Sequence, residues 1–369
     1  MHVRTLTLQE LRRDLAIDDL TDPEDGPHAI QLIIDQAVEA LGAWGCQVRR
    51  IRANPVVSVA DNYDRLRIGA EAVSRETRYT RYVGDGVMLR SHTSVMVPPA
   101  LRGLAERPSR DVLLVCAGMV YRRDSIDRLH SGTPHQLDLW RIRSEKLLTV
   151  ADLDEMVNRL VEVLTPGLRH RSLPRQHPYT THGRQVDVQV GDEWVEIAEG
   201  GLAHPEVLVD AGLRACTGLA IGVGLDRLLM IRKGVPDIRL LRLKDQRIAS
   251  QMLDLEPYRE VSAYPPIRRH LSIAVGINDD AEELGDRVRQ ELGEDSQSVE
   301  TIRVLSETLP ADLPKPAVER LGLRPGQKNV LLEVVLRDLE RTLTDEDANQ
   351  LRDRIYDSLH EGDRVAVTR

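Results

Sequence analysis

A run of charged residues near position 125 carries side chains suited to binding phosphate: Val120-Tyr121-Arg122-Arg123-Asp124-Ser125-Ile126-Asp127-Arg128-Leu129-His130. An arginine guanidinium presents a planar fork of N–H donors that pairs with phosphate or carboxylate oxygens. The apolar run within residues 111–123 predicts a buried strand that ends in the arginines, and residues 135–142 predict a second strand. The charged run would then be the tip of an antiparallel hairpin that could hold a nucleoside triphosphate. Taken alone, such a run is more often a solvated loop of ion pairs.

A second segment, Thr217 to Met230, combines a strand of small residues with a helix whose first turn carries Arg227. Glycines let a flat ligand approach the backbone closely, and an arginine beside them could cover a phosphate or stack on a base. Close packing of the helix on the strand would explain the same glycines. The segment is not a dinucleotide-binding fingerprint, because the third glycine and the βαβ context are missing.

The segments become specific in combination. The following occur in the order and spacing of the class II aminoacyl-tRNA synthetase core, and they resemble its phenylalanyl branch: Arg90-Ser91-His92-Thr93-Ser94, Val120 to Asp124 with His130, His135-Gln136-Leu137-Asp138, and Gly218 to Arg239. Asn62-Tyr63-Asp64 resembles the Asn-Phe-Asp of that family, and Ala203 to Leu208 fits it as well. The resemblance extends from about Asp19 to about Gly362.

The resemblance implies a ligase that forms an aminoacyl adenylate from ATP and an amino acid and passes the aminoacyl group to the 3′ end of a tRNA. It implies that Arg122 bridges the substrate carboxylate and the α-phosphate and that Arg227 binds the distant phosphates. Asp124 and His130 would hold ATP, and Mg²⁺ would bridge phosphate oxygens with few protein ligands. The amino-acid pocket would be formed by His92, Ser94, Gln136, Asp138, His177, Tyr179 and Ala220, with Gln136 and Asp138 holding the ammonium group.

The implied fold is α+β in two domains. Residues 1–256 would form the class II catalytic domain, an antiparallel sheet flanked by helices, and residues 257–369 a ferredoxin-like anticodon-binding domain. From the residues themselves, prolines at 257, 265 and 266 mark a linker, and the pattern after it predicts the order βαββαβ, ending in a strand at 364–367. The best candidates for tRNA contact are Arg268, Arg269 and Arg341. A catalytic domain fused to this module resembles the organellar, monomeric form of the enzyme.

The chain of 369 residues contains no phenylalanine. The Phe-Pro-Phe that walls the substrate ring in the family aligns with His177-Pro178-Tyr179, and Asp138 stands where the family has Glu. Two interpretations are open: the pocket accepts a modified or more polar aromatic amino acid, or it takes phenylalanine with substitute walls. Because the avoidance extends over the whole chain, we take phenylalanine and its tRNA as the default substrates. The avoidance suggests a back-up or self-protecting enzyme, made when charged phenylalanine tRNA is scarce or mischarged.

The composition sets limits on the partners. With 41% hydrophobic and 30% charged residues and no long apolar run, the chain reads as globular, without a membrane partner. The three cysteines lie far apart, and with an N-terminus unlike a signal peptide we expect free thiols and a cytoplasmic location.

The net charge of -9 counts against a broad basic surface for RNA, as do 16 Lys and Arg against 23 Asp and Glu from Tyr258 onward. A rival reading is a synthetase-like protein that binds amino acid and ATP as a sensor, or makes adenylates without charging tRNA. The complete C-terminal module argues against that rival.

Overall fold

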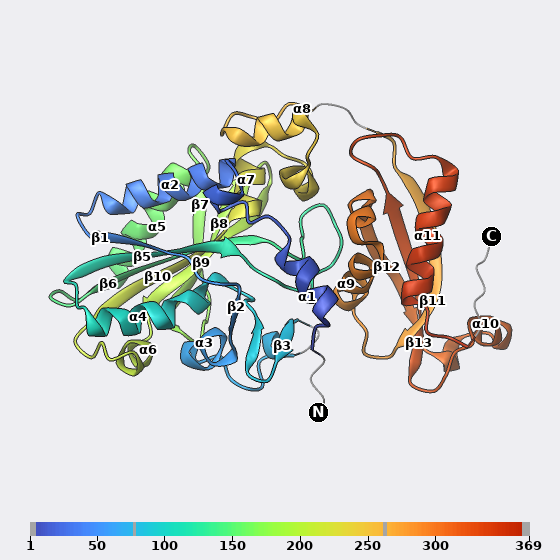
Figure 1. Ribbon diagram of the computed structural model, residues 1–369, viewed down its shortest axis with the longest axis horizontal. Coiled ribbons are helices and arrows are strands. Elements are labelled where there is room, and N and C mark those ends of the chain that lie inside the picture. Colours follow the sequence, from blue (N-terminus) through green and yellow to red (C-terminus); the bar gives the residue numbers. More distant parts are fainter. Residues whose placement is uncertain (1–4, 77–78, 261–263, 364–369) are drawn as a thin grey trace. The chain divides into compact units, whose positions relative to one another are not determined.

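The computed structural model describes residues 5–76, 79–260 and 264–363, which form two compact units (Figure 1). Unit 1 comprises the described residues of Met1–Arg122, Thr133–Pro236 and Ala249–Tyr258. Unit 2 comprises those of Arg123–Gly132, Asp237–Ile248 and Arg259–Arg369. The loop from Arg123 to Gly132 therefore belongs to unit 2, although the chain on either side of it belongs to unit 1.

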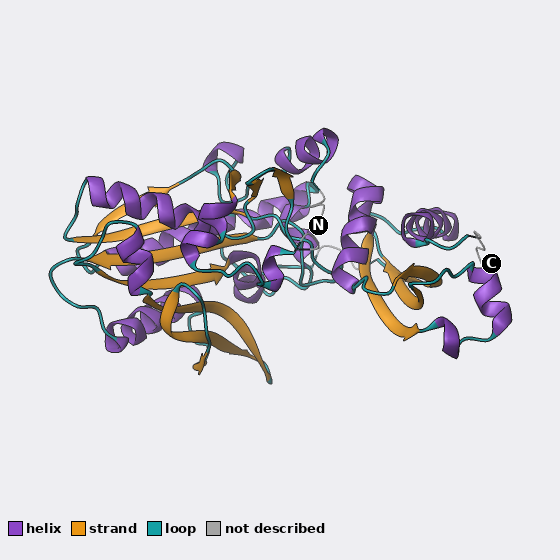
Figure 2. Ribbon diagram, turned by 90° about the horizontal axis from the view of Figure 1, so that it is seen from below, coloured by secondary structure: helices purple, strands orange, loops and turns teal. Residues whose placement is uncertain are grey.

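Unit 1 is built on a seven-stranded sheet. Its spatial order is β1 (Gln47–Ile51), β5 (Asp111–Met119), β6 (His135–Arg143), β10 (Thr217–Gly224), β9 (Glu193–Ala203), β8 (Thr180–Val190) and β7 (His170–Pro174). All neighbours pair antiparallel except β1 and β5, which are parallel. A small second sheet contains β2 (Val56–Ser58), β4 (Val87–Leu89) and β3 (Tyr82–Gly84). A sheet dominated by antiparallel pairs and flanked by helices is the predicted α+β architecture, which is confirmed (Figure 2).

Helices cover both faces of this sheet (Figures 1 and 2). One face carries α2 (Ala29–Gly42), α5 (Val150–Leu164) and α7 (Leu225–Lys233), and the other carries α4 (Val97–Glu106) and α6 (Pro205–Asp210). Shorter helices of this unit are α1 (Leu8–Leu15) and α3 (Val59–Asn62). Two helix ends have clear physical causes: Thr149 caps α5 in a capping box with Asp152, and Gly234 ends α7 in the left-handed region at φ 69°.

The alternation of side chains along the central strands separates two environments. On β10, Ile221 and Val223 line a small apolar cavity with residues of α5, whereas Gly222 lies opposite Asp138 of β6 on the other face. On β6, Trp140 and Ile142 join the apolar cluster of α4 and α6, and Gln136 and Asp138 continue that face toward the start of the strand. The predicted polar residues therefore project from one face of the sheet.

Unit 2 contains β11 (Ile267–Gly276), α9 (Ala281–Leu292), β12 (Val299–Thr308), α10 (Lys315–Leu321), β13 (Gln327–Leu336) and α11 (Asp345–Leu359), and α8 (Gln246–Ala249) lies ahead of them. The sheet order is β11-β13-β12, antiparallel throughout. The order strand–helix–strand–strand–helix predicted from the sequence is present, with α10 added before β13. The predicted last strand at 364–367 lies outside the described residues. Ile126, from the charged loop, lies in the core of this unit beside residues of all three strands.

One sequence expectation was wrong in detail. The strand expected within residues 111–123 ends at Met119, and Arg122 and Arg123 follow it in irregular backbone. Val120 N–H still bonds to Pro134 O in the register of the two strands, but the Tyr121 N–H bonds to Arg90 O of another segment, and the chain leaves the ladder there. The division between the predicted domains at residues 256 and 257 stays a prediction.

Candidate functional site

The start of β6 presents two polar side chains on the face opposite α5. The Asp138 carboxylate accepts hydrogen bonds from Thr93 Oγ1 at 2.6 Å and from Ser94 Oγ at 3.0 Å. Gln136 Oε1 accepts from the Thr93 backbone N–H at 3.4 Å. Burial raises the pKa of Asp138, and the two hydroxyl donors only partly offset this effect. A buried carboxylate held by neutral donors is a natural partner for a cationic group of a ligand.

His92 directly precedes Thr93 and Ser94, the residues that bind Asp138, and its ring is neutral. Its Nε2 is 3.4 Å from Asn62 Nδ2, which also donates to Ser91 Oγ at 2.8 Å. Burial, and to a lesser extent the Arg122 guanidinium, lowers the pKa of His92 to about 3. Among the described residues, His92 Nδ1 has no hydrogen-bond partner within the protein. Because a buried polar atom is costly to leave unpaired, this nitrogen is free to bind a ligand.

Arg122 supplies the positive charge among these groups. Its Nε donates to Ser91 O at 2.8 Å, and its own carbonyl accepts from Arg81 at 2.9 Å. Its charge affects the pKa values of His92, Asp138, Tyr179 and Glu199, so its guanidinium lies within electrostatic reach of all four. The structure thus gathers Arg122 with the predicted amino-acid residues. That location suits a fork that joins a carboxylate to a phosphate.

Three rings form a column along the site. Tyr179 stacks on Trp140 with centroids 6.1 Å apart, and His177 stacks on Tyr179 at 5.8 Å, each at 27°. Both nitrogens of His177 are engaged, Nδ1 with Thr180 Oγ1 and Nε2 with Glu199 Oε2, each at 3.1 Å. Burial is the main cause that raises the pKa of Tyr179, so its phenol stays neutral. The two polar rings that replace phenylalanines are therefore integrated into the hydrogen-bond network.

Ala220 lies on β10 directly opposite Trp140 and is 2% exposed. Its partner on β9 is Gly201, where an added Cβ would lie 2.8 Å from Thr180 Cβ, so the neighbouring strands leave no room for a side chain there. The small residues keep the floor beneath the ring column flat.

Arg227 lies in the first turn of α7, and its Nη1 is 3.5 Å from Glu196 O on β9. Glu196 lies near it, and Glu199 follows on the same strand. Burial and the charge of Glu199 raise the pKa of Glu196, whereas the hydrogen bond from His177 is the main cause that lowers the pKa of Glu199. Arg175 pairs with Glu199 at 3.2 Å. Arg227 thus belongs to a cluster of alternating charges on the same sheet.

Asp124 and His130 lie on the loop that belongs to unit 2. His130 Nδ1 is 2.7 Å from Asp127 Oδ2, and Asp124 Oδ1 accepts from the Ser125 N–H at 2.9 Å. Burial opposes the ionised form of Asp127, but hydrogen bonds from His130 and from the Leu129 N–H outweigh it, so the pKa of Asp127 is lowered. Their association with the residues of unit 1 stays a prediction.

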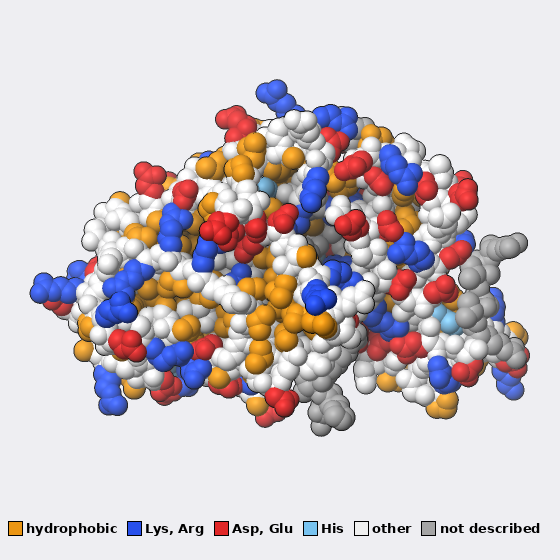
Figure 3. Space-filling view, viewed as in Figure 1, with side chains coloured by type: hydrophobic (Ala, Val, Ile, Leu, Met, Phe, Trp, Pro, Cys, Tyr) orange, Lys and Arg blue, Asp and Glu red, His pale blue; other side chains and the backbone are white. Residues whose placement is uncertain are grey.

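The candidates for tRNA contact all have acidic partners. Arg268 pairs with Glu333 at 3.3 Å, Arg269 with Asp345 at 2.8 Å, and Arg341 with Asp347 at 2.8 Å. On the face of the protein in Figure 3, blue and red side chains are interspersed. The charge of that face is therefore mixed, and any RNA contact there would compete with internal ion pairs.

Three residues of this arrangement escaped the sequence analysis: Glu196, Glu199 and Arg175. Glu196 and Glu199 are three positions apart on β9, and nothing local in the sequence indicates that residues 175–177 fold back beside Glu199. A Cβ on Gly183 would lie 2.2 Å from Arg175 O, so only glycine allows that approach. Within the part of the chain that the structure describes, no group of three or more His, Cys, Asp or Glu could hold a metal ion, and no helix could span a membrane.

Comparison with known proteins yields a consistent set of relatives. Residues 13–252 match the family described as tRNA synthetases class II core domain (F). The chain is 26% identical over 322 residues to "Phenylalanine--tRNA ligase, chloroplastic/mitochondrial" of Arabidopsis thaliana, which covers 83% of this chain and 70% of that protein. It is 28% identical over 360 residues to "Probable phenylalanine--tRNA ligase, mitochondrial" of Drosophila melanogaster, covering 82% and 75%. It is 31% identical over 241 residues to "Phenylalanine--tRNA ligase alpha subunit" of Prochlorococcus marinus (strain MIT 9313), covering 63% and 69%.

Proposed function

The chain belongs to the class II aminoacyl-tRNA synthetases, in their phenylalanyl branch, and on that premise we propose that it activates phenylalanine with ATP and transfers it to phenylalanine tRNA. The observation that carries this proposal is the position of Arg122 within electrostatic reach of His92, Asp138, Tyr179 and Glu199 on one face of the sheet. One guanidinium surrounded by a buried carboxylate, a neutral histidine and an aromatic column fits an aromatic amino acid bound beside a phosphate.

The ammonium group of the substrate would bind Asp138 and Gln136. Asp138 is buried and held by two hydroxyl groups, so a bound ammonium would relieve the cost of its burial. The family has a glutamate at this position, so the side chain of Asp138 is one methylene shorter. Thr93 and Ser94 hold this shorter carboxylate in place. The ring would lie against the column of Trp140, Tyr179 and His177.

The reaction at phosphorus needs charge stabilisation and alignment more than covalent help from the protein. Arg122 would hold the substrate carboxylate and the α-phosphate together for in-line attack, and Arg227 would bind the distant phosphates. Asp124 and His130 would contact ATP from the loop. When bound, Mg²⁺ would neutralise phosphate charge, and Glu196 beside Arg227, with Glu199 on the same strand, would be the carboxylates that hold it. One or two protein carboxylates suffice for Mg²⁺, because phosphates and water supply its other ligands.

Unit 2 would bind the tRNA, with Arg268, Arg269 and Arg341 as the first residues to examine.

The alignments to the two organellar relatives cover 82–83% of the chain, against 63% for the bacterial α subunit. This favours the single-chain form of the enzyme, and we propose a monomer in the cytoplasm. A mass of about twice the 41.5 kDa of the chain by light scattering would contradict the monomer, and recovery of the protein in a membrane or organelle fraction would contradict the location.

The decisive experiment is pyrophosphate exchange by the pure protein with ATP and a panel of aromatic amino acids, followed by charging of phenylalanine tRNA. We expect phenylalanine to support exchange and to be transferred. Exchange without transfer would favour an adenylate-forming protein or a sensor. No exchange with any member of the panel would refute the proposed reaction.

The polar ring column favours a second candidate substrate. His177 and Tyr179 bring a hydroxyl group and an ion-paired imidazole to positions where a phenylalanine side chain would meet only carbon. A substrate ring with a hydroxyl substituent would find partners there. If a hydroxylated aromatic amino acid gives a higher kcat/KM than phenylalanine, and His177→Phe reverses that order, this second candidate replaces the first.

The absence of phenylalanine from 369 residues supports a back-up role for the enzyme. A chain without phenylalanine codons can be translated correctly when the charged phenylalanine tRNA is scarce or carries the wrong amino acid. Expression of this chain under phenylalanine starvation should therefore exceed that of a version with phenylalanine restored at Tyr63, His177 and Tyr179. Equal yields of the two chains would remove the reason for the proposal.

A further inference from the structure

His135 is a fully buried side chain that belongs to neither the ring column nor the carboxylate pair. Its backbone N–H donates to Asp226 Oδ2 at 2.5 Å, and its Nδ1 is 2.9 Å from Asp226 Oδ1. Nε2 lies 3.2 Å from the Leu20 backbone nitrogen. A backbone N–H can only donate, so Nε2 accepts and the ring proton is on Nδ1, where it bonds to the carboxylate. His135 therefore donates from Nδ1 and accepts at Nε2.

The last pair in the ladder between β6 and β10 is Gln136–Gly224, so the ladder stops short of His135, the first residue of β6. Beyond Gly224 the chain turns into α7, whose first turn holds Asp226 and Arg227. The Asp226 carboxylate stands where the next residue of β10 would have paired. It also lies at the helix N-terminus, where a negative charge is favoured by the unpaired N–H groups.

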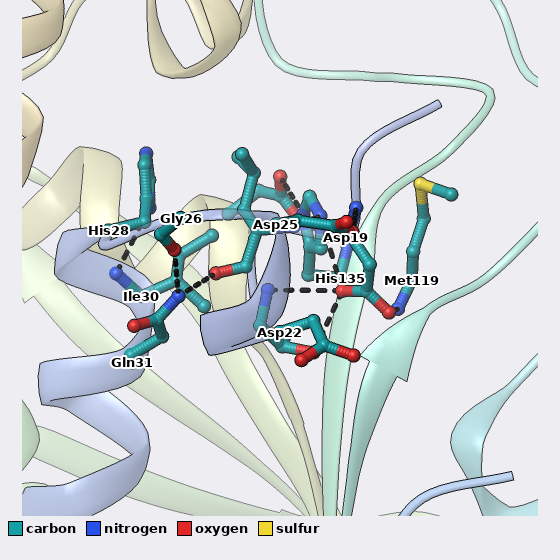
Figure 4. Close-up of polar contacts among 12 residues, drawn as sticks. Asp19, Asp22, Asp25, Gly26, His28, Ile30, Gln31, Met119 and His135 are labelled. Carbon is teal, nitrogen blue, oxygen red and sulfur yellow. Dashed lines mark hydrogen bonds and ion pairs between the residues drawn. The ribbon is translucent and has the colours of Figure 1, made fainter. Parts of the chain in front are cut away.

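On the Nε2 side of the ring, Asp19 and the residues bonded to it hold His135 in place (Figure 4). Asp19 accepts from the Met119 N–H at 2.9 Å and lies 3.9 Å from His135 Nε2. Arg90 bonds to Asp19 at 3.3 Å and to Met119 O at 2.6 Å. The ring is thus held between the ends of β5 and β6, the loop at residues 19–22 and the start of α7.

We infer that His135 is a positioning residue that keeps two halves of the proposed site in register. It immediately precedes Gln136 on the strand that also carries Asp138, and its partner Asp226 immediately precedes Arg227. Through the two hydrogen bonds to one carboxylate, the ammonium-binding strand fixes the orientation of the helix turn that presents the phosphate-binding arginine. The inference rests on the proposed function, because it assigns His135 to the reaction proposed above.

The test compares four variants of the full chain in pyrophosphate exchange with ATP and phenylalanine. His135→Leu removes the Nδ1 donor, and we expect kcat/KM for ATP to fall about 10- to 100-fold, the range for losing a hydrogen bond to a charged group. His135→Asn places an amide N–H near the position of Nδ1, and we expect it to lose less than His135→Leu. The double variant His135→Leu/Asp226→Asn also removes the charge of the carboxylate that has lost its bond to Nδ1; we expect it to recover thermal stability without recovering kcat/KM.

Asp111→Asn is the matched control. Asp111 pairs bidentately with Arg141 at the other end of β6, at 2.9 and 2.7 Å, so the variant weakens a partly buried ion pair of the same strand. We expect a lower melting temperature with an unchanged KM for ATP.

The outcomes separate the two proposals. If the wild type supports exchange and His135→Leu matches it, or if the double variant recovers activity together with stability, His135 is merely structural and the inference fails while the proposed function stands. If the wild type supports no exchange, the proposed function fails, and this inference fails with it.

Discussion

The two faces of the large sheet are built from the same strands, and both bury apolar clusters, but they differ in the polar groups that they bury. Leu139 lies on the face of the sheet that carries α2, α5 and α7 and is fully buried, whereas its neighbours Asp138 and Trp140 face the proposed site. The helix side is apolar, including a cavity lined only by Val, Leu, Ile and Ala side chains of α5 and the strands. The site side buries a carboxylate, a neutral histidine and an arginine together.

This difference separates burial that stabilises the fold, on the helix side, from burial of polar groups on the site side, which lowers the stability. Burial of aliphatic side chains is favourable at roughly 25 cal/mol per Å². Burial of polar groups is at best neutral unless each is hydrogen-bonded. The site side is thus expected to cost stability in the free protein and to recover it when ligands supply the missing partners. Variants on the two faces should therefore separate into losses of activity and losses of stability.

Arg122→Ala should give the largest effect. Removing a guanidinium that stabilises charge at phosphorus typically lowers turnover by about 10²- to 10³-fold. We expect a loss of kcat of that order in pyrophosphate exchange. The thermal midpoint should change little, because the positive charge is removed from beside other groups of the site. Arg110→Ala, at an exposed ion pair with Glu145 at 3.1 Å, is the control and should keep full activity. A loss of less than ten-fold for Arg122→Ala would contradict its proposed role.

Leu139→Ala should show the opposite behaviour on the helix face. A fully buried leucine replaced by alanine leaves a cavity and costs about 2–5 kcal/mol of unfolding free energy. Urea unfolding measures that loss, and the KM values of the variant should match those of the wild type at a temperature where both are folded. A raised KM for phenylalanine would mean that the two faces are not independent.

Asp138→Asn, one residue from Leu139 but on the site face, is the counterpart of Leu139→Ala. We expect a 10- to 100-fold fall in kcat/KM for phenylalanine, because hydrogen bonds to charged groups are worth about 1.5–3 kcal/mol. Stability should be unchanged or slightly higher, since the variant removes a buried charge whose pKa is raised by burial. A large drop in unfolding free energy would show that the carboxylate serves the fold first. Thr93→Val removes one of its donors and should lie between Asp138→Asn and the wild type in kcat/KM.

The elements of both faces could be predicted from the sequence, whereas the contacts between them could not. The strand at 135–142, the strand and helix within 217–230 and the strand–helix order of unit 2 agree with the structure, because apolar spacing and turn residues are local signals. Arg122 and Asp138 were found through family resemblance. The Glu199–His177 pair and the Asp226–His135 pair were not found, because each joins residues more than 20 positions apart and depends on how strands end. The placement of Ile126 in the core of unit 2 is another case, since a charged loop gave no local sign of it.

The smallest predicted effect is a pH dependence that originates at His92. Its pKa in the folded protein is lowered from 6.5 to about 3, first by burial and then by Arg122. Below pH 6.5 the unfolded chain binds a proton that the folded protein does not bind until about pH 3. The contribution of this site to stability is therefore fully present above pH 6.5 and decreases as the pH falls toward 3, by at most about 1.4 kcal/mol per pH unit.

His92→Asn isolates this term, because asparagine does not titrate and the carboxylates of the protein affect both chains alike. Urea unfolding at pH 6 and pH 5 should show the wild type losing about 1 kcal/mol more than the variant over that unit. Parallel losses would mean that His92 becomes protonated in the folded protein, with its unpaired Nδ1 open to water. The site side would then be hydrated before a ligand binds, and the stability difference between the two faces would be smaller than their side chains imply.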